Sequence, residues 1–165
     1  MPERQTVEKA KSKLRHGRSP STAASEFVRE EMHHIRDGKH GARSTKQAIA
    51  IGLSKARRAG VPLAAPQRGS RSTRKAASRD LAIGQHKRKP RAPSRKRSRA
   101  VEGALKREPR RAASHRALAV QAHRTAQQRG HAARVRAARK AARTKGPAQR
   151  RAAARKAARS RARYA

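Results

Sequence analysis

The residues of this sequence best suited to chemistry are closely spaced cations near its C-terminal end. Four of them lie at positions i, i+3, i+4 and i+7 of a predicted helix and therefore share one helical face: Arg136, Arg139, Lys140 and Arg143. At a rise of about 1.5 Å per residue, this gives one cation per roughly 3 Å, close to the ~3.4 Å phosphate spacing along one DNA strand. The spacing predicts phosphate binding.

An internal repeat extends this pattern. The segment AARKAART at 137–144 recurs as AARKAARS at 153–160, and a second cationic run, HKRKPRAPSRKR, spans 86–97. Arginine outnumbers lysine by 33 to 14, which favours bidentate contacts to phosphate. We expect the nucleic-acid contacts to come from Lys87, Arg88, Lys89, Arg91, Arg95, Lys96, Arg97, Arg134, Arg136, Arg139, Lys140, Arg143, Arg151, Arg155, Lys156 and Arg159.

The shortage of aromatic side chains narrows the class of nucleic acid. Phe27 and Tyr164 are the aromatic residues of the sequence. Proteins that bind single strands, and many RNA-binding modules, stack bases on aromatic rings. We therefore expect double-stranded DNA as the main partner, with RNA or polyphosphate as alternatives.

A second candidate phosphate site lies at the start of a predicted helix near residue 44. The sequence Ser44-x-x-Gln47 is a capping box, which marks a helix N-terminus whose free amides can bind an anion. The alternative is an ordinary capped helix end. The residues of this predicted phosphate seat are Lys39, Arg43, Ser44, Thr45 and Lys46.

Histidines and acids near this helix could suggest a metal or catalytic site. The histidines are His33, His34 and His40, and the acids are Glu26, Glu30 and Glu31. Adjacent helical positions point about 100° apart, and no cysteine is present to add a thiolate ligand. We expect the acids to form a solvated face that attracts the basic tail or a partner. We predict no metal, no cofactor and no catalytic residue.

The charge distribution defines the regions that carry these residues. Residues 1–62 hold 14 cations and 6 acids, and the remaining 103 residues hold 33 cations and 3 acids, in a chain of net charge +38. Most large apolar residues of the first region recur at helical spacing, whereas the second region is rich in Ala, Ser and Pro. We predict a helical head at 1–62, a basic linker at 63–97 and an Ala/Arg-rich DNA-binding tail at 98–165.

Three helices are predicted in the head. The first is capped by Thr6 and stops at Gly17, the second runs from Pro20 to Arg36 or Asp37, and the third starts after Ser44 and ends before Gly60. In the tail, like charges four residues apart oppose helix formation. The predicted fold class is all-α, a small head of two to three helices followed by a largely disordered basic tail with helix-forming segments.

The remaining composition points to an intracellular environment. The sequence has no cysteine, no apolar run long enough for a membrane span, and an N-terminus without the apolar core of a signal peptide. We expect no membrane contact and a cytoplasmic location.

The block from Glu26 to Val61, EFVREEMHHIRDGKHGARSTKQAIAIGLSKARRAGV, with the SPST segment before it and the Ala/Arg tail after it, resembles a family of small basic bacterial proteins of unknown function. Members often carry loose names such as DNA-binding or plasmid-stabilisation protein. The tail is also similar to those of linker histones. The resemblance implies a bacterial, nucleoid-associated protein, although KRKPRAPSRKR at 87–97 is equally typical of a nuclear localisation signal.

Together these features predict a histone-like protein that binds and compacts double-stranded DNA without sequence specificity. Two alternatives stay open: an RNA-associated or ribosome-associated basic protein, and an adaptor whose head binds a protein partner. We expect no enzymatic activity, since the acids lack a nucleophile and a core large enough to position them.

Overall fold

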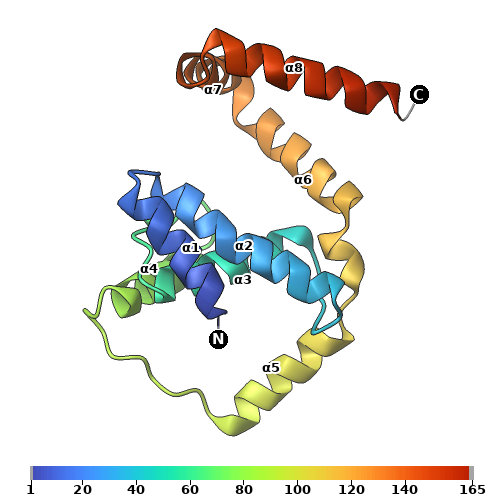
Figure 1. Ribbon diagram of the computed structural model, residues 1–165. Helices are drawn as coiled ribbons and strands as arrows, with labels where there is room; N and C mark the ends of the chain where they lie inside the picture. Colours follow the sequence, from blue (N-terminus) through green and yellow to red (C-terminus); the bar gives the residue numbers. More distant parts are fainter. Residues whose placement is uncertain (1, 164–165) are drawn as a thin grey trace. The chain divides into compact units, whose positions relative to one another are not determined.

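In the computed structural model, which describes residues 2–163, the chain is all-α (Figure 1). The elements in chain order are α1 Arg4–Arg15, α2 Pro20–Arg36, α3 Thr45–Arg58, α4 Arg71–Gly84, α5 Arg95–Arg107, the 3₁₀ helix η1 Arg110–Ala113, α6 His115–Gln128, α7 Gly130–Thr144 and α8 Pro147–Ala162. Contacts divide the chain into an N-terminal unit, residues 1–121, and a C-terminal unit, residues 122–165. No helix of the described residues is long and apolar enough to cross a membrane.

The pair α2 and α3 forms the centre of the N-terminal unit. The Ser19 hydroxyl accepts a hydrogen bond from the Thr22 amide, Pro20 occupies the first helical position, and Gly38 adopts the left-handed conformation that ends α2. Phe27 and Ile35 on α2 are fully buried. The predicted bounds of this helix are therefore confirmed.

The start of α3 is also confirmed, and its packing depends on a glycine. The Ser44 hydroxyl caps the Gln47 amide, and the Gln47 side chain accepts from the Arg43 amide. A Cβ at Gly52 would lie 2.7 Å from the Val28 Cα, so the absence of a side chain allows α2 and α3 to approach closely.

Helix α1 packs on α2 with the predicted apolar face. Ala10 is buried, and Val7 and Leu14 pack against the same core cluster as Phe27. The helix begins three residues earlier than predicted, because its N-cap is Glu3 and not Thr6. Thr6 is instead buried within the helix.

Helix α4 packs on α3 through small residues. A Cβ at Gly84 would fall 1.8 Å from the Arg57 carbonyl oxygen, so only glycine fits this contact. The Arg57 guanidinium is buried and donates to the carbonyls of Leu63 and Ala64, 3.1 Å each. These bonds fix the start of the connection between α3 and α4.

Residues 105–113 return to α2, α3 and the loop between them, beyond the predicted end of the head at residue 62. The Gly41 amide donates to the Leu105 carbonyl at 2.8 Å, and a Cβ at Gly41 would lie 1.8 Å from the Glu108 carbonyl oxygen. Ala112 and Ala113 are buried against α2 and α3. In Figure 1 the chain leaves α4 through an extended linker and comes back, after α5, beside the loop that follows α2.

The predicted disordered tail is wrong, because helices α5 to α8 cover most of residues 95–162. Alanine, arginine and lysine are strong helix formers, and their propensity acts at every position. The repulsion between Arg139 and Arg143 costs only a few tenths of a kcal/mol per pair. The prediction gave the repulsion too much weight and the propensity too little.

Candidate nucleic-acid interface

The linker between α4 and α5 closes a cationic concavity within the N-terminal unit, which we call the basic hollow. Its volume is about 740 Å³, and six of its described lining residues are cations: Arg58, Arg79, Arg88, Lys89, Arg91 and Arg97. Asp80 is the acid among them, but it is nearly buried and accepts a 2.5 Å hydrogen bond from the Ser54 hydroxyl. Cationic charge therefore dominates the hollow.

Helix α5 directs its N-terminus at this hollow. Ser94 and Arg97 line it, and the Ser94 hydroxyl caps the Arg97 amide. The other free amides at a helix N-terminus, together with its positive dipole end, attract anions. Arg95 and Lys96 in the same turn are unfavourable beside that dipole, and a bound phosphate would relieve the repulsion.

The structure brings together some of the predicted linker cations and adds two that the sequence did not indicate. Arg88, Lys89, Arg91 and Arg97 line the hollow, whereas Lys87, Arg95 and Lys96 are exposed outside its lining. Arg58 ends α3, and Arg79 lies on α4. No local sequence pattern marks these two arginines as binding residues. They line the hollow because α4 packs on α3.

In the C-terminal unit, α7 carries a one-sided row of cations. At about 100° per residue, its predicted set spans an arc of roughly 100°. That set is Arg136, Arg139, Lys140 and Arg143. All four are exposed, while Arg134 points to the opposite side.

Helix α8 carries its cations differently. Arg151, Arg155, Lys156 and Arg159, which the sequence analysis lists as nucleic-acid contacts, are exposed on this helix. Arg150 and Arg161 add charge on the other side, so the cations surround the helix axis. The repeat of 137–144 at 153–160 therefore gives two helices with different charge distributions, because their flanking residues differ.

The predicted phosphate seat at α3 is partly occupied by the protein itself. The Thr45 hydroxyl is buried and donates to the Ala112 carbonyl at 2.8 Å, and the Ser44 hydroxyl caps Gln47. Arg43 and Lys46 are exposed, and Lys39 lies 3.5 Å from Glu3. Two of the five seat residues therefore have protein partners for their hydroxyls, and the three cations remain accessible.

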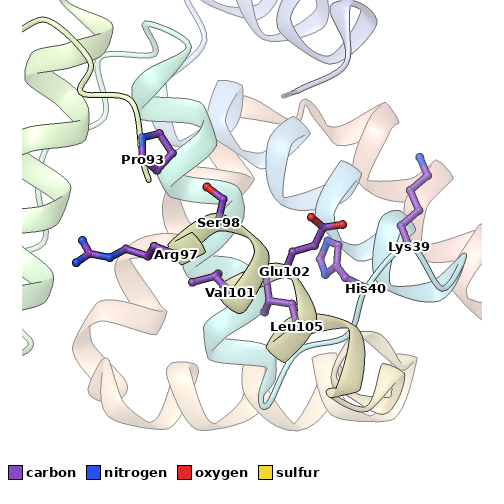
Figure 2. Close-up of a pocket in the computed structure, with 8 residues that line it drawn as sticks. All are labelled: Lys39, His40, Pro93, Arg97, Ser98, Val101, Glu102 and Leu105. Carbon is purple, nitrogen blue, oxygen red and sulfur yellow. The ribbon is translucent and has the colours of Figure 1, made fainter. Parts of the chain in front are cut away.

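A second hollow, of about 460 Å³, lies between α5 and the loop after α2 (Figure 2). Val101 and Leu105 line its α5 side, and Lys39 and His40 line its loop side. Glu102 also lines it and lies 2.8 Å from Lys106, whose hydrogen bond lowers the pKa of the Glu102 carboxyl. This hollow is more apolar than the basic hollow.

The acids of α2 do not form the predicted solvated face. Glu30 and Glu31 are buried, with 6% and 0% of their surface exposed, and Lys55 donates to Glu31 at 2.6 Å. Glu26 pairs with Lys13, so it is not a free anionic surface either. The sequence interpretation treated charge as exposure, whereas the packing of α3 and of the loop after α2 covers these side chains.

Contacts within the N-terminal unit change the pKa values of two further residues, Glu3 and Arg57. The hydrogen bond from His34 lowers the pKa of the Glu3 carboxyl, and Lys39 adds to the effect. Burial lowers the pKa of Arg57, and the nearby Asp80 charge partly offsets that change. Glu3 thus links the start of α1 to the end of α2 through its charge.

Comparison with known proteins identifies similarity for the α2–α3 region. A family of unknown function, DUF6496, matches residues 15–65 of the chain. No curated protein and no solved structure matches the chain. The matched residues include the whole of α2 and α3 and the loop between them, but neither the basic hollow's linker nor α7 and α8.

Proposed function

We propose that this protein binds double-stranded DNA without sequence specificity and compacts it, as a histone-like protein of the bacterial nucleoid. The observation that carries the proposal is the exposed row of cations on α7, spaced like the phosphates of one DNA strand. No Asp or Glu occurs after Glu108 in the sequence, so nothing acidic in that region competes with phosphate.

Compaction requires that one molecule contact two DNA segments. The basic hollow lies in the N-terminal unit, and the α7 and α8 cations lie in the C-terminal unit. Two cationic surfaces on one chain can engage two duplexes, and binding at the first raises the effective concentration at the second. We therefore expect bridging as well as simple coating of DNA.

The test uses full-length variants, because a fragment ending at residue 62 would lose the packing of α4 and of residues 105–113. In an α7 variant, Arg136, Arg139, Lys140 and Arg143 become Gln. In a hollow variant, Arg88, Lys89, Arg91 and Arg97 become Gln. A charge-matched control replaces the exposed α1 residues Arg4, Lys9, Lys11 and Arg15 with Gln.

Duplex affinity is measured against salt concentration. If about ten phosphates are contacted, the log-log slope of the wild type is near −9, and loss of four contacts lowers its magnitude by about 3 to 4. We expect that loss in the α7 and hollow variants and a smaller one in the α1 control. Equal losses in all three variants would show that total charge alone explains binding.

Bridging is measured separately, by light scattering of DNA at saturating protein. We expect the α7 and hollow variants each to bind DNA but to condense it poorly. Structured RNA and polyphosphate serve as competitors in the same assay. If RNA competes better than duplex DNA, the proposal fails in favour of an RNA-associated protein, and if no variant affects binding, the adaptor alternative is favoured.

A further inference from the structure

We propose that Glu31, His34 and His40 form a binding site for a zinc-class divalent metal ion. Each of the three residues offers one ligand atom, and these atoms all lie within 4.8 Å of one another. Glu31 and His34 are one turn apart on α2, and the turn at Gly38 brings His40 back beside them. This inference is independent of the proposed DNA binding.

The Glu31 carboxylate has one oxygen that the protein leaves without a hydrogen bond. Its Oε2 accepts from the Lys55 Nζ at 2.6 Å, whereas its Oε1 is buried and has no hydrogen-bond partner. The whole side chain is 0% exposed. A buried charged oxygen without a donor is costly, so its position beside two imidazoles points to a cation.

The His40 ring is oriented for metal binding by its backbone contact. Its Nδ1 lies 3.0 Å from the Gly41 carbonyl oxygen, which can only accept, so Nδ1 carries the proton. In the neutral ring the Nε2 lone pair then faces Glu31 Oε1 at 3.3 Å. Ligands about 2.0 Å from a tetrahedral metal lie roughly 3.3 Å apart, so this separation suits an ion between the two atoms.

The His34 ring has an outer partner of the kind that metal-bound histidines use. Its Nε2 lies 3.1 Å from the Glu3 Oε1, which allows one ring nitrogen to donate there while the other serves as ligand. Glu30 adds negative charge nearby, since its Oε1 lies 3.8 Å from the same nitrogen and its Oε2 is buried without a partner. These carboxylates offset the charge that a divalent ion brings.

The ligand set defines the class of metal. Two imidazoles and one carboxylate suit Zn²⁺ and similar transition metals, whereas Mg²⁺ and Ca²⁺ prefer oxygen ligands throughout. Three protein ligands leave a fourth position for water or another donor. Entry is from the hollow in Figure 2, where His40 is partly exposed and Glu102 reaches from α5 toward the same side.

The alternative occupant of the space between His40 and Glu31 is a proton on Nε2, which would make an ion pair without metal. A direct measurement of metal binding distinguishes this ion pair from a metal site. Full-length protein without a histidine tag is stripped with chelator and titrated with ZnCl₂ by calorimetry, and Co²⁺ is used as a visible probe of coordination geometry. We expect one Zn²⁺ per chain and the absorption bands of tetrahedral Co²⁺.

The variants are H40Q and, as a matched control, H33Q. His33 is adjacent to the cluster on the same helix but exposed and outside it. H40Q should weaken zinc binding at least about tenfold and H33Q should not change it. Zinc at 100 times its Kd should raise the Tm of the wild type by roughly 5–10 °C, and Mg²⁺ should not.

Two results would overturn the site. One is the absence of stoichiometric zinc binding by the wild type, with His40 titrating as an ion pair with Glu31 in NMR spectra. The other is equal zinc affinity of H40Q and H33Q. Because Glu31 also holds Lys55, E31Q is not used, and H34Q provides the second ligand variant, for which the same tenfold loss is expected.

Discussion

The N-terminal and C-terminal units are both helical, but different forces hold their helices. In the N-terminal unit, apolar faces of α1, α2 and α3 pack around Phe27 and Ile35, and buried polar contacts such as Lys55 with Glu31 lock the arrangement. In residues 122–163 no described residue is buried, so the helices there rest on the propensity of alanine and arginine. Helix content alone therefore does not reveal which part of this protein has a core.

The difference in packing also separates the two kinds of candidate site. The basic hollow and the Glu31–His34–His40 cluster depend on contacts between residues far apart in the sequence. The α7 cations depend only on helical periodicity. Core mutations should thus affect the first two sites and leave the third intact.

The largest expected effect comes from removing the central aromatic side chain. F27A deletes a fully buried ring and should lower the free energy of unfolding by about 3–5 kcal/mol. Domains of this size have only about 5–15 kcal/mol in total. Chemical denaturation followed by circular dichroism should shift the transition of the N-terminal unit to lower denaturant than in the wild type. The gradual loss of the helical signal of α7 and α8, which no core supports, should be the same in both proteins. A change in that signal would contradict the division into two units.

A proline in α7 tests whether the helices of the C-terminal unit are independent of the core of the N-terminal unit. A141P removes a backbone donor in the helix interior and should cost that helix about 3 kcal/mol. Far-ultraviolet ellipticity should fall, but the unfolding midpoint of the N-terminal unit should not move. A shift of that midpoint would mean that α7 stabilises the core. The salt dependence of DNA binding by the same variant measures how much the helical state of α7 contributes to phosphate contacts.

A smaller effect is expected where residues 105–113 dock on the loop after α2. G41A places a methyl group 1.8 Å from the Glu108 carbonyl oxygen and should cost about 1–3 kcal/mol. Amide exchange should accelerate at position 41 and at Ala42, whose amides donate to the Leu105 and Pro109 carbonyls in the wild type. The matched control is G146A, where a Cβ meets nothing within 4 Å and φ is −57°. Equal exchange rates in the two variants would argue against the docking.

The smallest effect is a pH dependence carried by Glu3. The hydrogen bond from His34 lowers the pKa of Glu3, so its contribution to stability is present above the ordinary glutamate pKa. That contribution is lost as the pH falls through the lowered pKa of the folded state. E3Q should therefore reduce the loss of thermal stability between neutral and acid pH, and only slightly because Glu3 is exposed. E8Q, at an exposed position of α1, is the control, and an identical pH profile for E3Q and wild type would exclude the effect.

Local signals in the sequence determined the helices of the first 62 residues and the cations of α7. Ser19, Pro20 and Gly38 act within a few residues of themselves, so their pattern alone gave the bounds of α2. The periodicity of Phe27, Met32 and Ile35 likewise identified a buried face. The helical state of the tail was also within reach of local propensity, but the prediction gave like-charge repulsion more weight than it deserves.

The tertiary structure alone decided which polar residues are buried and which cations share a concavity. Glu30 and Glu31 look solvated in the sequence, but α3 and the loop after α2 cover them. His40 joins Glu31 because the chain turns at Gly38, and Arg79 faces the linker because α4 packs on α3 through Gly84. Burial and the meeting of distant side chains depend on how elements pack, and packing involves residues that no local pattern connects.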